Sequence, residues 1–538
     1  MKKWVFLFLL CGFLYADVNH LNMGIVAHNK GLYSLSNQQL EKYIQQNPDG
    51  EYIDYAYLLY SANLIKLRKF NESKEKLLFL IENFPKSKFL KTAYINLILV
   101  NLQLSDLDSS LKFYKKYVEK WGENKQLENQ IAGKFIKEGI SFFKKDDYKK
   151  AEKIFSALIN NFKECEYADI ANYYTGLIYY QKNDFAKAKE KFLKVGEKNK
   201  KILPDLYLKI GDCFFNLKDY SKAKKYYKKV IENFPDTESK NWALFQMALI
   251  KKRKGKLKEA EETIEKIKTN DNNLKVKCLK TLSEIYILEE KWTDAENTIL
   301  EIFQKFPEEK NSANYIKLGF INFNMKNKDK AILYFKKALQ LNPPKKLKEK
   351  AYFGLGYTYY LNGEIEKAFS LWEKIENQFP SSCFLSEIYY IKGKKYFEMN
   401  NYEKSKKYFK KLLKYYKNSP FFLQSITLLI QIYINEGNIK QAENLSKKFK
   451  ERDEEINFLY GKILYIKKDF EKAKNVFEKT KIKNPLLKVE MIYYLAQIYL
   501  YEGKKEKAKE KLLEIITYYP QFKEFSKLAE KQLKKLEK

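Results

Sequence analysis

Hydrophobic and polar residues follow one another along the chain in blocks that fit pairs of amphipathic helices. In residues 313–343, apolar side chains recur at spacings of three and four, stop over the polar stretch 326–330, and then resume. Such spacings place apolar side chains on one face of an α-helix. The pattern therefore predicts two antiparallel helices joined by a short turn. Pro343 is expected to end the second helix, because its ring cannot continue one.

The same pattern recurs about every 36 residues along nearly the whole chain. Each predicted second helix has a small residue near its start: Ser73, Ser109, Ala151, Ala188, Ala223, Ala260, Ala295, Ala331, Ala368, Ser405, Ala442, Ala473 and Ala508. Most first helices have a Gly, Ala or Ser near their middle, as at Gly319 and Gly356, and a proline such as Pro235 or Pro485 follows many second helices. A fixed period of this length indicates a stacked array of repeats. The small residues are expected to let the two helices of a pair approach closely.

The unit at 313–343 resembles the tetratricopeptide repeat, with Tyr315, Gly319, Ala331, Phe335 and Ala338 at that family's characteristic positions. The resemblance extends over roughly residues 35–520. It implies an all-α fold, a right-handed α-solenoid of about 13–14 helical hairpins. It also implies that the first helices line a concave groove where partners bind.

Two irregular spacings and the two ends of the array predict its division. The small residues are 42 apart between Ser109 and Ala151, with the extra length near Trp121, and 31 apart between Ala442 and Ala473, which predicts a shortened helix ending near Phe449. The predicted segments are a signal peptide at 1–16, a degenerate N-terminal capping repeat at 17–50, an N-terminal sub-array at 51–120, a linker or hinge at 121–131, the main superhelix at 132–520, and a C-terminal capping helix at 521–538. The capping helix is expected to turn Phe525, Leu528, Leu533 and Leu536 inward.

The first sixteen residues have the pattern of an export signal. Lys2 and Lys3 precede an apolar run from Trp4 to Leu14, and Ala16 stands at a cleavage position. The run is shorter than the roughly 20 residues that span a bilayer. We expect a periplasmic or outer-membrane-associated protein. A lipoprotein acylated at Cys11 and an uncleaved anchor are the alternatives.

The chain is strongly basic, with a formal net charge of +34, and only three of its 102 basic residues are arginines. Arginine supplies the planar, bidentate donor pair that recognises phosphates and guanine edges, so this composition disfavours nucleic acid as a partner. The lysines are spread among glutamates in every repeat. One interpretation is that the lysines form an ordinary solvated surface. The other is that they attract an anionic envelope polymer or acidic lipid heads, and attraction to lipid heads would give peripheral membrane association.

No catalytic or metal-binding pattern stands out. Both histidines, His20 and His28, precede the first well-formed repeat, and the glycines stand singly rather than in a phosphate-binding loop. We therefore predict no enzyme activity, no cofactor and no metal. Whether the four cysteines after the signal segment pair with one another is left open: Cys165, Cys213, Cys278 and Cys383.

An aromatic stripe follows the predicted groove face of the first helices. It consists of Phe143, Tyr173, Tyr180, Phe215, Phe323, Phe353, Tyr360, Tyr390, Phe397, Phe458 and Tyr465. The rings would suit an extended peptide, an unfolded outer-membrane polypeptide or a sugar chain. The alternative is that they pack between successive helices.

Together these observations predict a non-enzymatic scaffold or adaptor whose protein partners act in outer-membrane biogenesis or envelope division. Helix ends such as Ile231 to Pro235 are similar in style to those of the bacterial envelope proteins BamD and YbgF, which are much shorter arrays. The first alternative is a binding scaffold for an anionic polysaccharide or peptidoglycan. The second is a hydrolase within the repeats, which would need a pair of carboxylates in the groove.

Overall fold

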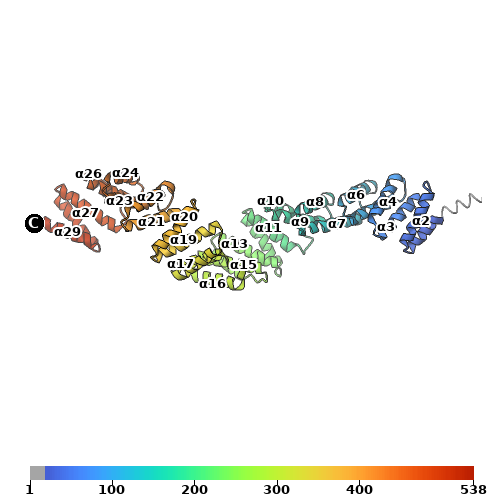
Figure 1. Ribbon diagram of the computed structural model, residues 1–538, viewed down its shortest axis with the longest axis horizontal. Helices are drawn as coiled ribbons and strands as arrows, with labels where there is room; N and C mark the ends of the chain where they lie inside the picture. The colour runs from blue at the N-terminus through green and yellow to red at the C-terminus, as the bar shows by residue number, and fades with distance from the viewer. Residues whose placement is uncertain (1–18, 538) are drawn as a thin grey trace, which may run out of the picture. The chain divides into compact units, whose positions relative to one another are not determined.

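The computed structural model describes residues 19–537, and within that range every regular element is a helix. A short 3-10 helix, Pro307–Glu309, accompanies the α-helices. This confirms the all-α prediction (Figure 1). The predicted signal peptide at 1–16 lies outside the described residues.

The helices pair as antiparallel hairpins. The first hairpin joins the helical residues 19–29 to α2. The later first helices are α3 (Ile53–Lys66), α5 (Leu90–Gln103), α7 (Lys125–Lys144), α9 (Glu166–Gln181), α11 (Leu203–Asn216), α13 (Glu238–Arg253), α15 (Asn272–Leu288), α17 (Ser312–Asn324), α19 (Lys345–Leu361), α21 (Leu385–Glu398), α23 (Phe422–Asn435), α25 (Glu454–Ile466) and α27 (Pro485–Tyr501). The second helices are α2 (Tyr33–Gln46), α4 (Phe70–Asn83), α6 (Leu107–Trp121), α8 (Tyr148–Asn161), α10 (Phe185–Leu193), α12 (Tyr220–Asn233), α14 (Leu257–Glu265), α16 (Trp292–Lys305), α18 (Lys328–Gln340), α20 (Ile365–Gln378), α22 (Tyr402–Tyr415), α24 (Ile439–Phe449), α26 (Phe470–Lys479) and α28 (Lys505–Tyr518). A last helix, α29 (Lys523–Leu536), follows the fourteen hairpins of the described range, in agreement with the predicted 13–14.

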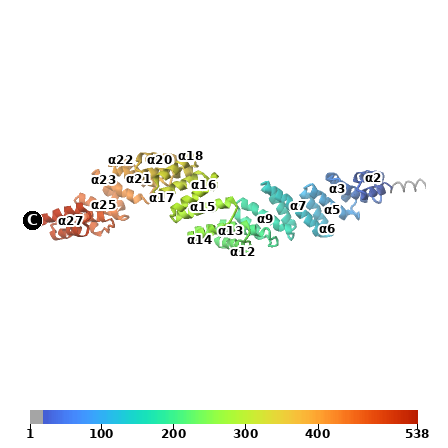
Figure 2. The same ribbon diagram turned by 90° about the horizontal axis from the view of Figure 1, so that it is seen from below.

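The chain divides into two compact units, one up to Cys278 and one from Leu279 onward, so the boundary falls within α15. Within each unit, consecutive hairpins pack side by side in chain order. Figure 2 shows the same order of hairpins within each unit when the view is turned by 90°.

Every hairpin turn contains one residue in the left-handed backbone region. These residues are Gly31, Arg68, Ser105, Asp146, Asn183, Lys218, Gly255, Glu290, Lys326, Gly363, Asn400, Gly437, Lys468 and Gly503. The amide that follows donates to a carbonyl five residues back, as from Asp219 to Phe214 at 2.9 Å. This is the hydrogen bond that commonly closes the C-terminus of a helix. The turns therefore repeat as regularly as the helices do.

Many second helices begin with a side-chain cap directly after that turn. The carboxylates of Asp147, Asp184, Asp219 and Asp469 each accept the amide three residues on. A cap of this kind satisfies one amide that the helix itself leaves unpaired.

The small residues of the first helices make room for a large side chain on the second helix. A Cβ atom placed on Gly319 would lie 2.6 Å from the ring of Phe335, sixteen residues later. The same spacing and the same close approach relate seven pairs with an aromatic partner: Gly139 and Phe155, Gly176 and Phe192, Gly211 and Tyr227, Gly319 and Phe335, Gly356 and Trp372, Gly393 and Phe409, and Gly461 and Phe477. Gly24 and Leu40 have the same spacing and approach, with an aliphatic partner. All seven rings are buried.

Several hairpins without that glycine have a smaller side chain at the second position, although Ile98 is matched by the large Tyr114. Ala248 is matched by Ile264 and Ala496 by Leu512, while Ile430 is matched by Ser446, all of them buried. The two volumes thus vary in opposite directions in these hairpins. The small residues were expected to let the two helix backbones approach each other. In the seven aromatic pairs, the space beside the glycine is instead filled by a ring of the second helix.

Four details of the predicted organisation differ from the structure. The small residue of α6 is Ser110, which is fully buried and donates to the carbonyl of Ile98, and Ser109 is instead the residue whose amide Asp106 caps. The predicted linker at 121–131 is mostly helical, since only residues 122–124 separate α6 from α7. Pro485 begins α27 rather than ending a hairpin, because the short α26 stops at Lys479. In the capping helix, Leu528 is 38% exposed, whereas Phe525, Leu533 and Leu536 pack inward as predicted.

The predicted shortened helix near Phe449 is confirmed. Helix α24 has eleven residues and ends at Phe449, whereas α22 and α28 have fourteen. The other predicted segment boundaries stay predictions.

Candidate functional site

Ten of the eleven aromatic residues of the predicted stripe are half-buried, and one is fully buried. They lie on α7, α9, α11, α17, α19, α21 and α25. Each of them contacts another ring of the protein. The stripe therefore takes part in packing and also keeps some exposed surface.

Five of these rings pack across the turn of their own hairpin. Each contacts the aromatic first residue of the second helix, five residues later. The ring centroids are 5.6 Å apart for Phe143 and Tyr148, 5.5 Å for Tyr180 and Phe185, 5.5 Å for Phe215 and Tyr220, 5.9 Å for Phe397 and Tyr402, and 5.4 Å for Tyr465 and Phe470. The aromatic residue at this position thus helps to close the hairpin turn.

Two rings in the second unit stack on the residue that precedes the next first helix. The centroids of Phe353 and Phe384 lie 4.2 Å apart, and those of Tyr390 and Phe421 lie 4.9 Å apart. Stacking of aromatic rings stabilises such pairs beyond the burial of their area. These two members of the stripe join one hairpin to the next.

The structure gathers three members of the stripe around Tyr357. Its ring centroid lies 5.5 Å from that of Phe323, 5.8 Å from that of Phe353 and 6.4 Å from that of Tyr360. Burial raises the pKa of Tyr357, and the nearby Glu387 adds to the effect. This patch on α17 and α19 is the densest aromatic part of the predicted stripe. Tyr357 was not among the predicted site residues.

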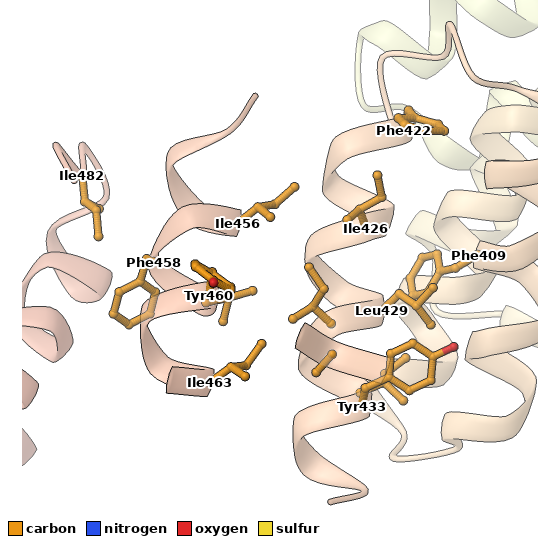
Figure 3. Packing of buried hydrophobic residues seen from close by; sticks show 14 of the residues in the cluster. Phe409, Phe422, Ile426, Leu429, Tyr433, Ile456, Phe458, Tyr460, Ile463 and Ile482 are labelled. Atoms are coloured by element: carbon orange, nitrogen blue, oxygen red, sulfur yellow. The ribbon is translucent and has the colours of Figure 1, made fainter. Parts of the chain in front are cut away.

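The prediction that Phe458 lines the groove is wrong. Its side chain has no exposed surface, and its ring lies 5.9 Å from the ring of Phe477. Figure 3 shows Phe458 on the side of α25 that faces Ile482, whereas Ile456 and Ile463 point toward the neighbouring helix. Because α25 is covered on both sides, a ring on either side of it becomes core.

In the first unit, tyrosines of the stripe bind carboxylates of the next hairpin. Tyr173 donates to Asp205, and Tyr180 donates to Asp212 at 3.1 Å, while Tyr227 donates to the other oxygen of Asp212 at 2.9 Å. The ammonium of Lys209 lies 4.8 Å from the ring centre of Tyr180. This cluster joins α9, α11 and α12 through hydrogen bonds. It uses the hydroxyl groups of rings for which the sequence left open either a ligand-binding or a packing role.

Asp212 is the most strongly buried carboxylate of this cluster, with 5% of its surface exposed. Burial raises its pKa to about 6, against the lowering effects of Lys209 and of the two tyrosine hydroxyls. A buried carboxylate without a direct ion pair is more easily protonated, because a low-dielectric environment disfavours the charged form.

Three of the cavities in the described range adjoin α7. One, of about 500 Å³, is bounded by α3, α4, α5 and α7, and includes Leu99, Gln103 and Gln130. The other two, of about 520 and 560 Å³, lie between α6 and α8 and at the α8–α9 turn. None of the eleven predicted residues lines these three cavities. The irregular spacing between the second helices α6 and α8 was the sequence signal for this region.

Side chains that could bind a metal do not cluster in the part of the chain that the structure describes. Within residues 19–537 no cluster of three or more His, Cys, Asp or Glu side chains could hold a metal ion. Cys165, Cys213, Cys278 and Cys383 are free thiols, and burial raises the pKa values of Cys213 and Cys278 to about 12. No described helix is both long and apolar enough to cross a membrane.

Family models described as tetratricopeptide repeats match six segments of the chain. They cover residues 136–201, 205–237, 312–345, 350–382, 386–419 and 490–521, which correspond to hairpins in both units. No curated protein matches the chain.

Among solved structures, the chain is similar to the C-terminal part of a TPR repeat-containing protein from Cytophaga hutchinsonii. The identity is 17% over 46% of this chain and 96% of that one, with a TM-score of 0.39. It is also similar to the apo form of the quorum sensor NprR from B. thuringiensis, at 17% identity over 60% of this chain and 98% of that one, with a TM-score of 0.36. Yeast Tom70 matches at 16% identity over 91% of this chain and 96% of that one, with a TM-score of 0.29.

Proposed function

Because the chain is a tetratricopeptide repeat protein, we propose that it is a non-enzymatic scaffold that binds protein partners in the bacterial cell envelope. The observation that carries the scaffold role is the run of hairpins that present first-helix faces with partly exposed aromatic and amide side chains. Faces of this kind suit extended polypeptides, because aromatic rings supply contact area and amides pair with peptide groups.

The envelope role rests on the first sixteen residues of the sequence. Lys2, Lys3, the apolar run from Trp4 to Leu14 and Ala16 support export across the inner membrane. Partners in outer-membrane biogenesis or envelope division would meet the protein in the periplasm or at the outer membrane.

Crosslinking in cells followed by recovery of the tagged protein from envelope fractions tests this proposal. The expected result is a small set of proteins that crosslink to the first helices, together with a mature N-terminus at Asp17. A protein that stays in the cytoplasmic fraction with Met1 intact would contradict the envelope role. A tagged protein that recovers no discrete partner would contradict the scaffold role.

An anionic polysaccharide or peptidoglycan is the second candidate partner. The exposed lysines of α22 favour it: Lys407, Lys410 and Lys414 recur at helical spacing, and Lys414 stands 5.0 Å from the ring centre of the exposed Tyr415. Attraction between lysines and a polyanion is screened by salt. Retention on purified envelope polymer that 0.5 M salt fails to reduce, or that survives replacement of the three lysines by glutamine, would argue against this candidate.

A further inference from the structure

The cavity bounded by α3, α4, α5 and α7 has the features of a peptide-binding pocket. Its volume is about 500 Å³, within the usual range of about 300–1,000 Å³ for ligand pockets. Ile65, Phe70 and Leu99 supply apolar walls, and each of these side chains is only half-buried. An apolar group that entered the pocket would remove this surface from water, which is favourable.

Three carboxamides surround the apolar walls. They belong to Asn96, which is half-buried, and to the exposed Gln103 and Gln130. A carboxamide offers both a donor and an acceptor, as does a peptide group. The rim of the pocket therefore matches an extended backbone that runs across it.

The pocket is also close to neutral, although the chain as a whole carries a formal charge of +34. Lys134 is its one charged lining residue, and its ammonium lies 3.0 Å from the carboxylate of Glu138. A charged ligand group would lose its hydration here without gaining an opposite charge, which is costly. This argument favours an uncharged occupant over an anionic polymer or a basic segment.

We propose that this pocket binds one bulky apolar side chain of an extended, uncharged stretch of a protein partner, with Asn96, Gln103 and Gln130 pairing with the backbone on either side. The inference rests on the proposed scaffold function and names the part of the first-helix surface that selects the partner.

The test uses the full chain and an array of end-capped nonapeptides. Their flanks contain only Gly, Ala, Ser, Asn and Gln, and the central residue varies over all twenty amino acids. The expected result is binding at least tenfold stronger for central Phe, Leu, Ile or Met than for Asp, Glu or Lys. A photoreactive phenylalanine at the centre should crosslink to α3, α5 or α7. Equal binding of charged and apolar centres, no binding at all, or crosslinks confined to other helices would overturn the proposal.

Two variants and a matched control locate the effect. Leu99→Trp should fill the pocket and weaken binding of the best peptide at least tenfold. Gln103→Glu, at an exposed position that leaves the fold intact, should weaken it severalfold. Gln181→Glu makes the same change at the equivalent exposed position of α9 and should have no effect. If both pocket variants bind peptides as the unchanged protein does, the pocket is not the site. If they also recover the crosslinked envelope partners normally, the scaffold function stands without it.

Discussion

At the scale of single residues, many of the hairpins have matched volumes at two positions sixteen residues apart. Gly319 faces the ring of Phe335, while Ala496 is matched by Leu512. The glycines could be predicted because single small residues at a fixed period stand out against a lysine-rich background. Their partner could not, because periodicity alone does not say whether the space is filled by a backbone or by a ring.

Gly319→Ala should destabilise the protein, although alanine is the better helix former by about 1 kcal/mol. The new methyl group would lie 2.6 Å from Phe335, whose ring also abuts Gly354 of the next hairpin and cannot move away. Overpacking of this kind costs about 1–3 kcal/mol. Urea unfolding monitored by circular dichroism measures the effect.

The double variant Gly319→Ala with Phe335→Leu provides the control for that change. The two substitutions together recreate the combination of Ala496 and Leu512 that the protein already uses. We expect a favourable coupling of about 1 kcal/mol or more between the two substitutions. Strictly additive effects would show that the two positions do not share the space.

Asp212 should make stability depend on pH. Its folded pKa of about 6 lies above the ordinary value of 3.8 for this carboxyl, so its contribution to stability is greatest below pH 4 and is lost as the pH rises through 6. At about 1.4 kcal/mol per pKa unit, the loss is at most about 3 kcal/mol. Asp212→Asn should therefore reduce the loss of stability between pH 4.5 and 7.5, measured by urea unfolding.

Asp236→Asn removes a carboxylate from an exposed loop and serves as the comparison. An unchanged pH profile in Asp212→Asn, or the same change in both variants, would contradict the assignment to Asp212.

At the scale of elements, the hairpin turn is the most uniform part of the structure. The left-handed residue is glycine in some turns and lysine in others, such as Lys218 with φ 65°. Side chains with a Cβ disfavour this region by about 1–2 kcal/mol. Stability should therefore respond to the identity of this residue.

Lys218→Gly should stabilise the protein by about 1 kcal/mol, and Gly363→Lys should destabilise it by a similar amount. A Cβ at Gly363 would meet no atom within 4 Å, so the backbone conformation alone is tested there. Thermal unfolding of each variant measures the change in its stability. Shifts of the same sign would contradict the left-handed turn.

Element lengths were predicted well where the period is regular and less well where it changes. The extra residues near Trp121 were interpreted as a linker, but they lengthen α7, because residues 125–131 continue the apolar spacing at Leu127 and Ile131, both of which are buried. Leu528 was expected to face inward because it fits the helical spacing. Within the described residues no hairpin covers that side of α29, so part of the surface of Leu528 is exposed.

At the scale of the whole molecule, the periodicity predicted the architecture but only part of the candidate site. The aromatic stripe follows from the spacing, yet Phe458 is core and the rings of Phe143 and Phe397 pack across turns. Exposure depends on which neighbouring hairpin covers each ring, and one repeat does not contain that information. The cavity beside α7 is lined by residues of four helices, so a search for regular positions within one repeat misses it.

Removal of one complete repeat tests the central claim that this chain is an array of hairpins in which each unit packs on its neighbours. Deletion of residues 331–367 joins Lys330 to Ala368 and sets Gly319 sixteen residues before Trp372, a pairing like that of Gly356. The account predicts a soluble variant with the same helix content per residue and a cooperative unfolding transition, whereas deletion of 331–349, half a period, should abolish both. An in-register deletion that unfolds the protein as completely as the half-period deletion would contradict it.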